Sequence, residues 1–244
     1  MIEEIRAKNT FSFNEPIVFS LKADMRNKKF PANVHEENTF KVLKVAGIYG
    51  PNNAGKTCLI QCIKSIKEVI LDQPTISLRA NLFSKDPVCV LGVTFLNDGH
   101  EYSYDFRYNP ESKEHDYEKF SEILIDKYGN EKEENWLLVD HRTNNYYSDD
   151  TELQKMIAIV AKNNLLMYLI DTNKFEHLNR MKQILVSFAE KIDIIDMNNI
   201  PLQKTIDLIK NKNRLQEKVV DFIRNADIYL DNYEYDNDLK INFN

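Results

Sequence analysis

Four residues at a fixed spacing have the chemistry needed to hold a chain of phosphates. Gly50, Gly55, Lys56 and Thr57 satisfy the pattern G-x-x-x-x-G-K-[ST]. Glycines let the backbone wrap closely around phosphate oxygens, and the N–H groups of such a loop form a nest for anions. A lysine at this place reaches the β- and γ-phosphates, and the hydroxyl that follows binds Mg²⁺. The pattern therefore predicts a nucleoside triphosphate site, with ATP and Mg²⁺ as the expected ligands.

The expected binding residues run without a gap from the first glycine into the helix that follows the loop. They are Gly50, Pro51, Asn52, Asn53, Ala54, Gly55, Lys56, Thr57 and Cys58. Thr57 is also the expected Mg²⁺ ligand. The helix that begins near Lys56 would direct its positive dipole end toward the phosphates. The pattern assigns no catalytic residue, and it leaves the choice between ATP and GTP open.

Such a loop needs a strand before it and a helix after it. Val42–Tyr49 is an apolar, β-branched run of the kind expected for a strand that is buried on both faces. Lys56–Leu71 carries apolar residues at helical spacing, which predicts a helix with one buried face. Asp72-Gln73-Pro74 would end that helix. The local sequence therefore predicts the order strand, loop, helix.

Alternating patterns and turn signals predict β structure on both sides of this unit. Lys22–Thr39 is polar and is interpreted as a loop. Asn97-Asp98-Gly99-His100 is a strong hairpin signal. The expected strands are Ile2–Ala7, Ile17–Leu21, Val88–Leu96, Glu101–Tyr108, Glu122–Tyr128 and Asn135–His141.

Helical periodicity replaces the alternating pattern from Thr151 onward. The terminal stretch Ile228–Asn244 alternates again and predicts a strand. We expect a nucleotide-binding αβ lobe over 1–148, a helical lobe over 149–227 and a terminal strand or tail over 228–244. The expected helices are Thr151–Ala161, Leu165–Ile170, Phe175–Lys191, Leu202–Lys210 and Arg214–Asn225.

Composition narrows the class of protein. A net charge of −6 argues against a generally basic nucleic-acid surface, although a local basic groove remains open. No apolar run approaches the roughly 18 residues of a membrane span, and no signal peptide precedes the first strand. The three cysteines, Cys58, Cys62 and Cys89, predict free, packed thiols in a reducing cytoplasm. The sequence therefore predicts a cytoplasmic protein without a membrane partner.

Ala46–Thr57 resembles the Walker A region of ABC-type ATPase heads, in which the form G-x-N-x-x-G-K-[ST] is common. The most similar group is the prokaryotic AAA ATPases of the abortive-infection and overcoming-lysogenisation-defect kind. The opening stretch Ile2–Phe13 looks like the first strand of that group, which has an x-N-F-x-S-F theme, and Asn9-Thr10-Phe11-Ser12-Phe13 stands in its place. The segments Val93–Phe95, Tyr102–Tyr104 and Phe120–Leu124 are also similar.

This resemblance implies an α/β fold, the P-loop NTPase head of the ABC type. A mixed β-sheet lobe would surround the Walker A helix, and an α-helical lobe would follow. It also implies ATP hydrolysis by two heads that sandwich ATP, in a homodimer or with a chain that carries the remaining motifs. Work in phage defence or on nucleic acid, often with a nuclease as partner, is a further implication of the resemblance.

The chain departs from the family pattern in the residues that would activate water. Leu166–Asp171 has apolar residues before an acid, but Thr172 follows where a glutamate is expected. Lys191–Asp196 is a second weak candidate. The Q-loop glutamine of the family has no clear counterpart, and Gln73 is only a guess for it. For both acids, a solvated helix or strand end is the favoured interpretation. We therefore expect the N-terminal part of a longer ATPase, whose missing motifs come from another segment or chain.

Two other functions remain as alternatives. A binding-only scaffold subunit would use the same loop without turnover. A kinase or GTPase is less favoured, because Asn173-Lys174 is followed by Phe175-Glu176 and so lacks the guanine-reading motif. The histidines are scattered, which argues against a metal cluster, and His115-Asp116 and Asp140-His141-Arg142 are interpreted as solvated. The alternating aromatics Tyr102, Tyr104, Phe106 and Tyr108 are expected to pack in the core.

Overall fold

The computed structural model of the chain forms two compact units, Met1–Ile192 and Asp193–Asn244. The predicted lobe boundaries at 148 and 227 remain predictions. In the second unit, β10 (Tyr233–Tyr235) pairs antiparallel with β11 (Ile241–Phe243). The helices predicted within 202–225 lie outside the described residues, apart from Lys218, which is helical. The structure describes residues 1–24, 29–73, 75–126, 130–160, 162–195, 218, 233–235 and 241–243.

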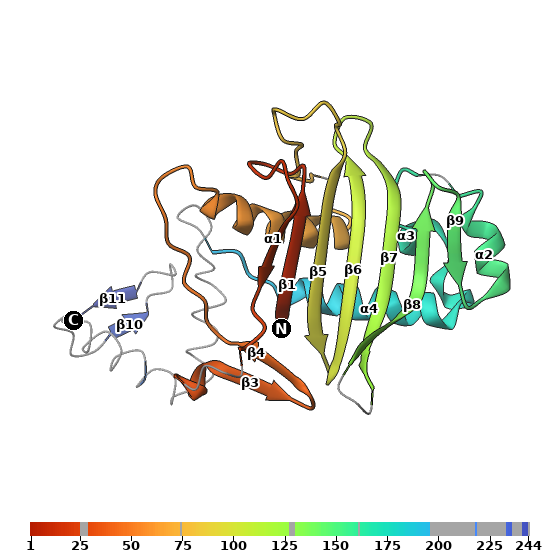
Figure 1. Cartoon of the computed structure of the whole chain (residues 1–244). Helices are drawn as coiled ribbons and strands as arrows, with labels where there is room; N and C mark the ends of the chain where they lie inside the picture. The colour runs from red at the N-terminus through yellow and green to blue at the C-terminus, as the bar shows by residue number, and fades with distance from the viewer. Residues whose placement is uncertain are drawn as a thin grey trace. The chain divides into compact units, whose positions relative to one another are not determined.

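A seven-stranded sheet forms the centre of the first unit (Figure 1). Its strands lie in the order β2-β1-β5-β6-β7-β8-β9, and every pairing between them is antiparallel. The bounds are β1 Ile2–Lys8, β2 Ile17–Ser20, β5 Cys89–Asn97, β6 His100–Asn109, β7 Glu114–Ile125, β8 Glu131–Asp140 and β9 Asn145–Ser148.

Helices cover one face of this sheet. In Figure 1, α1 and α4 both cross behind the strands. The rings of Phe95 on β5 and Phe188 on α4 stack between sheet and helix, with centroids 3.9 Å apart. No helix among the described residues has the length and apolar character that a membrane span requires. The helical elements are η1 Pro31–Asn33, α1 Lys56–Ile70, α2 Thr151–Ile157, α3 Leu166–Leu169, η2 Thr172–Lys174 and α4 Glu176–Glu190.

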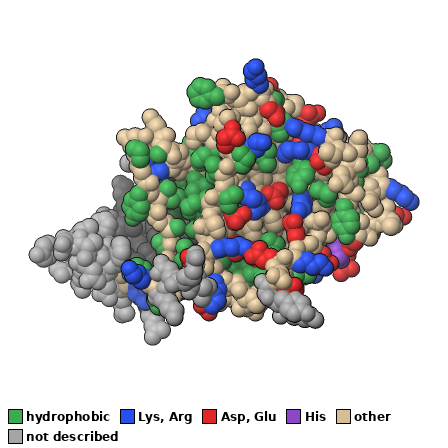
Figure 2. All heavy atoms as spheres, viewed as in Figure 1, with side chains coloured by type: hydrophobic (Ala, Val, Ile, Leu, Met, Phe, Trp, Pro, Cys, Tyr) green, Lys and Arg blue, Asp and Glu red, His purple; other side chains and the backbone are tan. Residues whose placement is uncertain are grey.

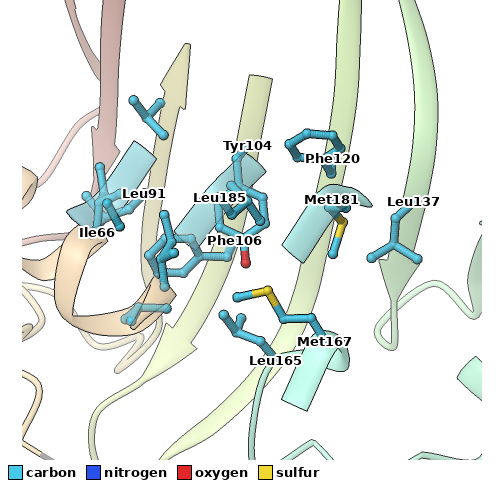
Figure 3. Packing of buried hydrophobic residues seen from close by; sticks show 14 of the residues in the cluster. Ile66, Leu91, Tyr104, Phe106, Phe120, Leu137, Leu165, Met167, Met181 and Leu185 are labelled. Atoms are coloured by element: carbon cyan, nitrogen blue, oxygen red, sulfur yellow. The ribbon is translucent and has the colours of Figure 1, made fainter. Parts of the chain in front are cut away.

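The core fills the space between the sheet and these helices. Figure 3 shows Ile66 of α1, Leu91 of β5 and Met181 of α4 pointing into one cluster. The alternating aromatics of β6 are buried on this face, as predicted, because successive side chains of a strand point to opposite faces. Burial of these aromatic and aliphatic side chains is the main force that holds α1 in place.

The opposite face of the sheet is polar. Figure 2 shows basic and acidic side chains interspersed over it. Arg6 of β1 forms two hydrogen bonds with the carboxylate of Asp105 on β6, at 2.9 and 3.1 Å. Since charges of both signs alternate across the strands, this face is held by cross-strand pairs.

The segment before the phosphate loop differs from the prediction. β3 (Val34–Glu37) and β4 (Phe40–Leu43) form a two-stranded antiparallel sheet, so Lys22–Thr39 is not wholly a loop. The strand predicted over Val42–Tyr49 is wrong beyond Leu43, because residues 44–50 belong to no strand. A strand that is apolar on both faces needs parallel neighbours, and no described strand offers one.

Candidate nucleotide-binding site

The glycine-rich loop leads directly into α1. Gly55 is the residue before the first helical position, and its φ of 86° lies in the left-handed region that favours glycine. The backbone N–H of Leu59 donates to the carbonyl of Gly55 over 3.2 Å and so closes the first helical turn. The sequence therefore placed the start of this helix correctly, at Lys56.

The N-terminal end of α1 is open to an anion. No side chain caps it, and the described first turn of α1 contains no acidic residue. The N–H groups of a first turn have no partner within their helix, and the dipole places partial positive charge there. Thr57 is exposed in this turn and Cys58 is half-buried beside it. The geometry is that of an anion-binding helix end.

Lys56 folds its ammonium group back over the loop. Its Nζ donates to the carbonyl oxygens of Gly50 at 2.8 Å and Pro51 at 2.6 Å. Both acceptors are neutral carbonyl oxygens, whereas a phosphate oxygen carries negative charge and attracts the ammonium group by a full charge–charge interaction. A phosphate oxygen at the loop can therefore compete for this lysine. The ammonium group of Lys56 therefore already lies at the loop, as the sequence pattern predicts.

The loop that follows β1 lies directly against Gly55 of the phosphate loop. A Cβ added to Gly55 would lie 3.1 Å from Ser12 Oγ and 3.2 Å from the ring of Phe13. The backbone of Thr10 and Phe13 exchanges two hydrogen bonds of 2.9 Å, which fixes this loop. In the sequence, the family resemblance alone draws attention to Ser12 and Phe13, and it gives them no place beside the phosphate loop. No spacing pattern could have shown their contact with Gly55, because Ser12 and Gly55 lie 43 positions apart in the sequence and meet only in the folded chain.

The contact depends on how β1 and α1 are placed by the rest of the fold.

The cysteines serve packing rather than chemistry. Cys62 and Cys89 are fully buried, and burial raises the pKa of each thiol to about 12. Thiols with such pKa values stay protonated at neutral pH and are poor nucleophiles and metal ligands. The prediction of free, packed thiols is confirmed for these two residues, while Cys58 is only half-buried.

Of the two candidate acids for water activation, the structure describes Asp171 alone. Asp171 follows the helix α3 and accepts a hydrogen bond from the N–H of Asn173 at 3.2 Å, so it caps η2. The favoured interpretation, a solvated helix end, is confirmed for Asp171. The other acid, Asp196, lies outside the described residues.

Gln73, the guess for the Q-loop glutamine, lies at the end of α1 that is remote from the phosphate loop. The helix has 15 residues and is therefore about 22 Å long at 1.5 Å per residue. Gln73 follows its C-terminal end, whereas the loop precedes its N-terminal end. The guess from sequence is wrong, because one helix length separates the two.

The histidines have diverse surroundings. His115 is 7% exposed, which contradicts its interpretation as a solvated residue, and burial lowers its pKa to about 4. β7 turns its side chain inward against Tyr108, with ring centroids 4.8 Å apart.

Within the described part of the chain, no group of three His, Cys, Asp or Glu side chains has a geometry that could hold a metal ion. Three other histidines pair with carboxylates: His35 with Glu37, His100 with Glu122 and His177 with Asp149.

One comparison decides the family. Residues 45–238 match the family described as "AAA domain, putative AbiEii toxin, Type IV TA system". The matched region is most of the chain and includes the whole loop from Gly50 to Thr57. The chain belongs to this AAA family. No curated protein matches it.

Membership explains the arrangement around the loop. AAA domains are nucleotide-binding P-loop ATPases, and the predicted α/β P-loop NTPase fold is confirmed. In this AAA domain α1 lies on one face of the seven-stranded sheet, and the helices α2 to α4 follow β9 in sequence. The open end of α1 and the nearby ammonium group of Lys56 fit the triphosphate that such a domain binds. The loop is therefore the candidate site for the nucleotide.

Proposed function

We propose that residues 50–57 of this AAA domain bind the phosphates of ATP together with Mg²⁺. The N–H groups of the loop and of the first turn of α1 hold phosphate oxygens, and Cys58 contributes its backbone at the end of that turn. Lys56 pairs with the β- and γ-phosphates, and the exposed hydroxyl of Thr57 binds the metal ion. Mg²⁺ supplies charge that neutralises the phosphate oxygens.

One observation carries this proposal. The end of α1 lacks both a capping side chain and a first-turn acid, while the ammonium group of Lys56 lies within 2.8 Å of the loop carbonyls. An uncapped helix end with an adjacent cation leaves N–H donors unsatisfied unless water or an anion supplies the acceptors. A triphosphate supplies several acceptors at once.

A partner segment is proposed to cover the residues before the loop. Val45, Ile48 and Tyr49 are 71%, 39% and 93% exposed, although their sequence is that of a buried strand. Residues 46–49 form no backbone hydrogen bond with any described residue. A parallel strand beside them would satisfy this backbone and bury these side chains. The occupant would be a segment that carries the remaining ATPase motifs.

Hydrolysis is proposed to depend on that partner. Among the described residues, no acid forms a hydrogen bond or an ion pair with residues 50–57. The proposal therefore takes the apolar-Asp-Glu strand and the signature helix from a partner segment. A second head that carries these motifs would supply both when it dimerises with this chain. Nucleotide binding would then control assembly, and assembly would control turnover.

A role in phage defence or in work on nucleic acid, with a nuclease as partner, is the biological part of the proposal. Its support is the family description and the resemblance of Ala46–Thr57 to abortive-infection ATPases. Expression of the chain with its genomic neighbours in a phage-sensitive host should lower plaque counts, and Lys56→Ala should restore them. Equal plaque counts with and without the wild-type genes would count against this role.

The central test replaces the loop lysine. Lys56→Ala should weaken binding of Mg²⁺-ATP by roughly tenfold to a hundredfold, because charge-assisted hydrogen bonds to phosphate are lost. The measurement is a fluorescence titration with a labelled ATP. Lys64→Ala is the matched control, since Lys64 is a half-buried lysine of the same helix and its Nζ lies 3.7 Å from the carboxylate of Glu68. Unchanged affinity in Lys56→Ala would refute the site, and binding without turnover in every assembly would favour a scaffold.

A further inference from the structure

A cavity lies at the C-terminal end of α1. It is lined by residues that follow α1, by residues in and beside the turn between β6 and β7, and by residues just before α3. Its volume is about 670 Å³, within the range of roughly 300–1,000 Å³ that small-molecule sites occupy. The cleft is large enough for a ligand of nucleoside size.

The cleft is separate from the phosphate loop and has different electrostatics. The two lie at opposite ends of a helix that is about 22 Å long. The C-terminal end of a helix is its negative pole, and Asp72 adds a carboxylate there. Lys113 lines the other side and balances this charge. A chain of phosphates is therefore disfavoured here, whereas a neutral polar ligand is not.

Three carboxamide groups line the cleft. Asn164 is fixed, because its Nδ2 donates to Asp72 at 3.0 Å and its Oδ1 accepts from the N–H of Leu165 at 2.7 Å. Gln73 and Asn163 are exposed, and their amides have no hydrogen-bond partner among the described residues. Each carboxamide offers both a donor and an acceptor. Two of the three are free to pair with a ligand.

The floor of the cleft is aromatic and fixed. Tyr108 and His115 are 6% and 7% exposed, and their rings contact each other. The backbone N–H of His115 donates to the carbonyl of Lys162 at 2.6 Å, which ties β7 to the segment before α3. Burial lowers the pKa of His115, so the ring is neutral at physiological pH. Its Nδ1 is buried without a partner in the described part of the chain.

We propose that this cleft is a second ligand site and that it takes a nucleoside. Carboxamides pair with the edges of nucleobases through one donor and one acceptor, and Gln73 and Asn163 present both. The balanced charge suits a ligand without phosphate, and the aromatic floor suits a planar ring. The inference does not depend on the phosphate loop, because a nucleoside has no phosphate for that loop to hold.

The test uses the Lys56→Ala chain, so that the phosphate loop makes no contribution. Adenosine, guanosine, cytidine and uridine are titrated by calorimetry, and at least one should bind with a Kd on the order of 0.1 mM. The double variant Gln73→Ala/Asn163→Ala should weaken that binding about tenfold or more, because two amide pairings are lost. Asn14→Ala removes an exposed carboxamide outside the cleft and should change nothing.

Three results would overturn the nucleoside site. They are no saturable binding of any of the four nucleosides, equal binding by the double variant, and equal binding of ribose without a base. Circular dichroism of the double variant confirms that the chain is folded. ATP binding by the wild-type chain is measured separately, and its absence would count against the phosphate loop without touching this cleft.

Discussion

Gly92 shows at the scale of one residue how the polar face of the sheet is built. A Cβ at this position would lie 1.9 Å from Asp105 Oδ1 and 2.9 Å from Arg6 Nε. The missing side chain thus leaves room for the paired hydrogen bonds between Arg6 and Asp105. Sequence patterns predict a strand through Gly92, but they cannot show which side chains fill the space above it.

We predict that Gly92→Ala lowers the free energy of unfolding by roughly 1–3 kcal/mol, because the Arg6–Asp105 pair must move. Urea denaturation measures the change. Gly47→Ala is the matched control. A Cβ there would lie 2.8 Å from the ring of Tyr49, which is 93% exposed and free to turn away. Equal stability of the two variants would contradict the account of Gly92.

At the scale of elements, the sequence predicts best those helices and strands whose formation is decided by their own residues. Helix α1 and the β5–β6 hairpin were predicted within one or two residues at each end. Their signals are periodicity and a two-residue turn, in which Asp98 and Gly99 both have positive φ. The strand predicted up to Tyr49 was wrong because its neighbours, rather than its own residues, decide whether it forms.

The exposed segment leads to a prediction about its partner. In the chain alone, the amides of residues 46–49 should exchange with deuterium as fast as those of an unstructured peptide, since they lack backbone hydrogen bonds to described residues. Addition of a chain that carries the remaining ATPase motifs should slow this exchange. The amides of β6, inside the seven-stranded sheet, provide the internal control. Slow exchange without any partner would contradict the prediction.

At the scale of the whole molecule, buried ionisable groups couple stability to pH. Glu101 is 1% exposed, and burial together with the neighbouring Glu3 raises its pKa to about 8. Lys22 Nζ lies 3.6 Å from a carboxylate oxygen of Glu3 and 3.6 Å from one of Glu101. Its positive charge lowers the pKa of Glu101, but by less than burial and Glu3 raise it. Because the folded pKa exceeds the unfolded value, this group favours the folded state at low pH. That contribution is lost as the pH rises through about 8.

We predict that the melting temperature of the wild-type chain falls as the pH rises from about 5 to about 8, the interval between the unfolded and folded pKa values of Glu101. Glu101→Gln should reduce this fall by about 5 °C. Glutamine keeps the shape of the protonated carboxyl group and cannot ionise. The measurement is thermal unfolding at a series of pH values. Parallel pH profiles for the two proteins would show that Glu101 is not the group responsible.

The claim that residues 50–57 form a phosphate cradle is tested most directly by competition. Wild-type chain with bound, labelled Mg²⁺-ATP is titrated with inorganic tripolyphosphate and, separately, with adenosine. A cradle that holds the nucleotide through its phosphates predicts that tripolyphosphate displaces ATP and that adenosine does not. Displacement by adenosine with no effect of tripolyphosphate would contradict the account.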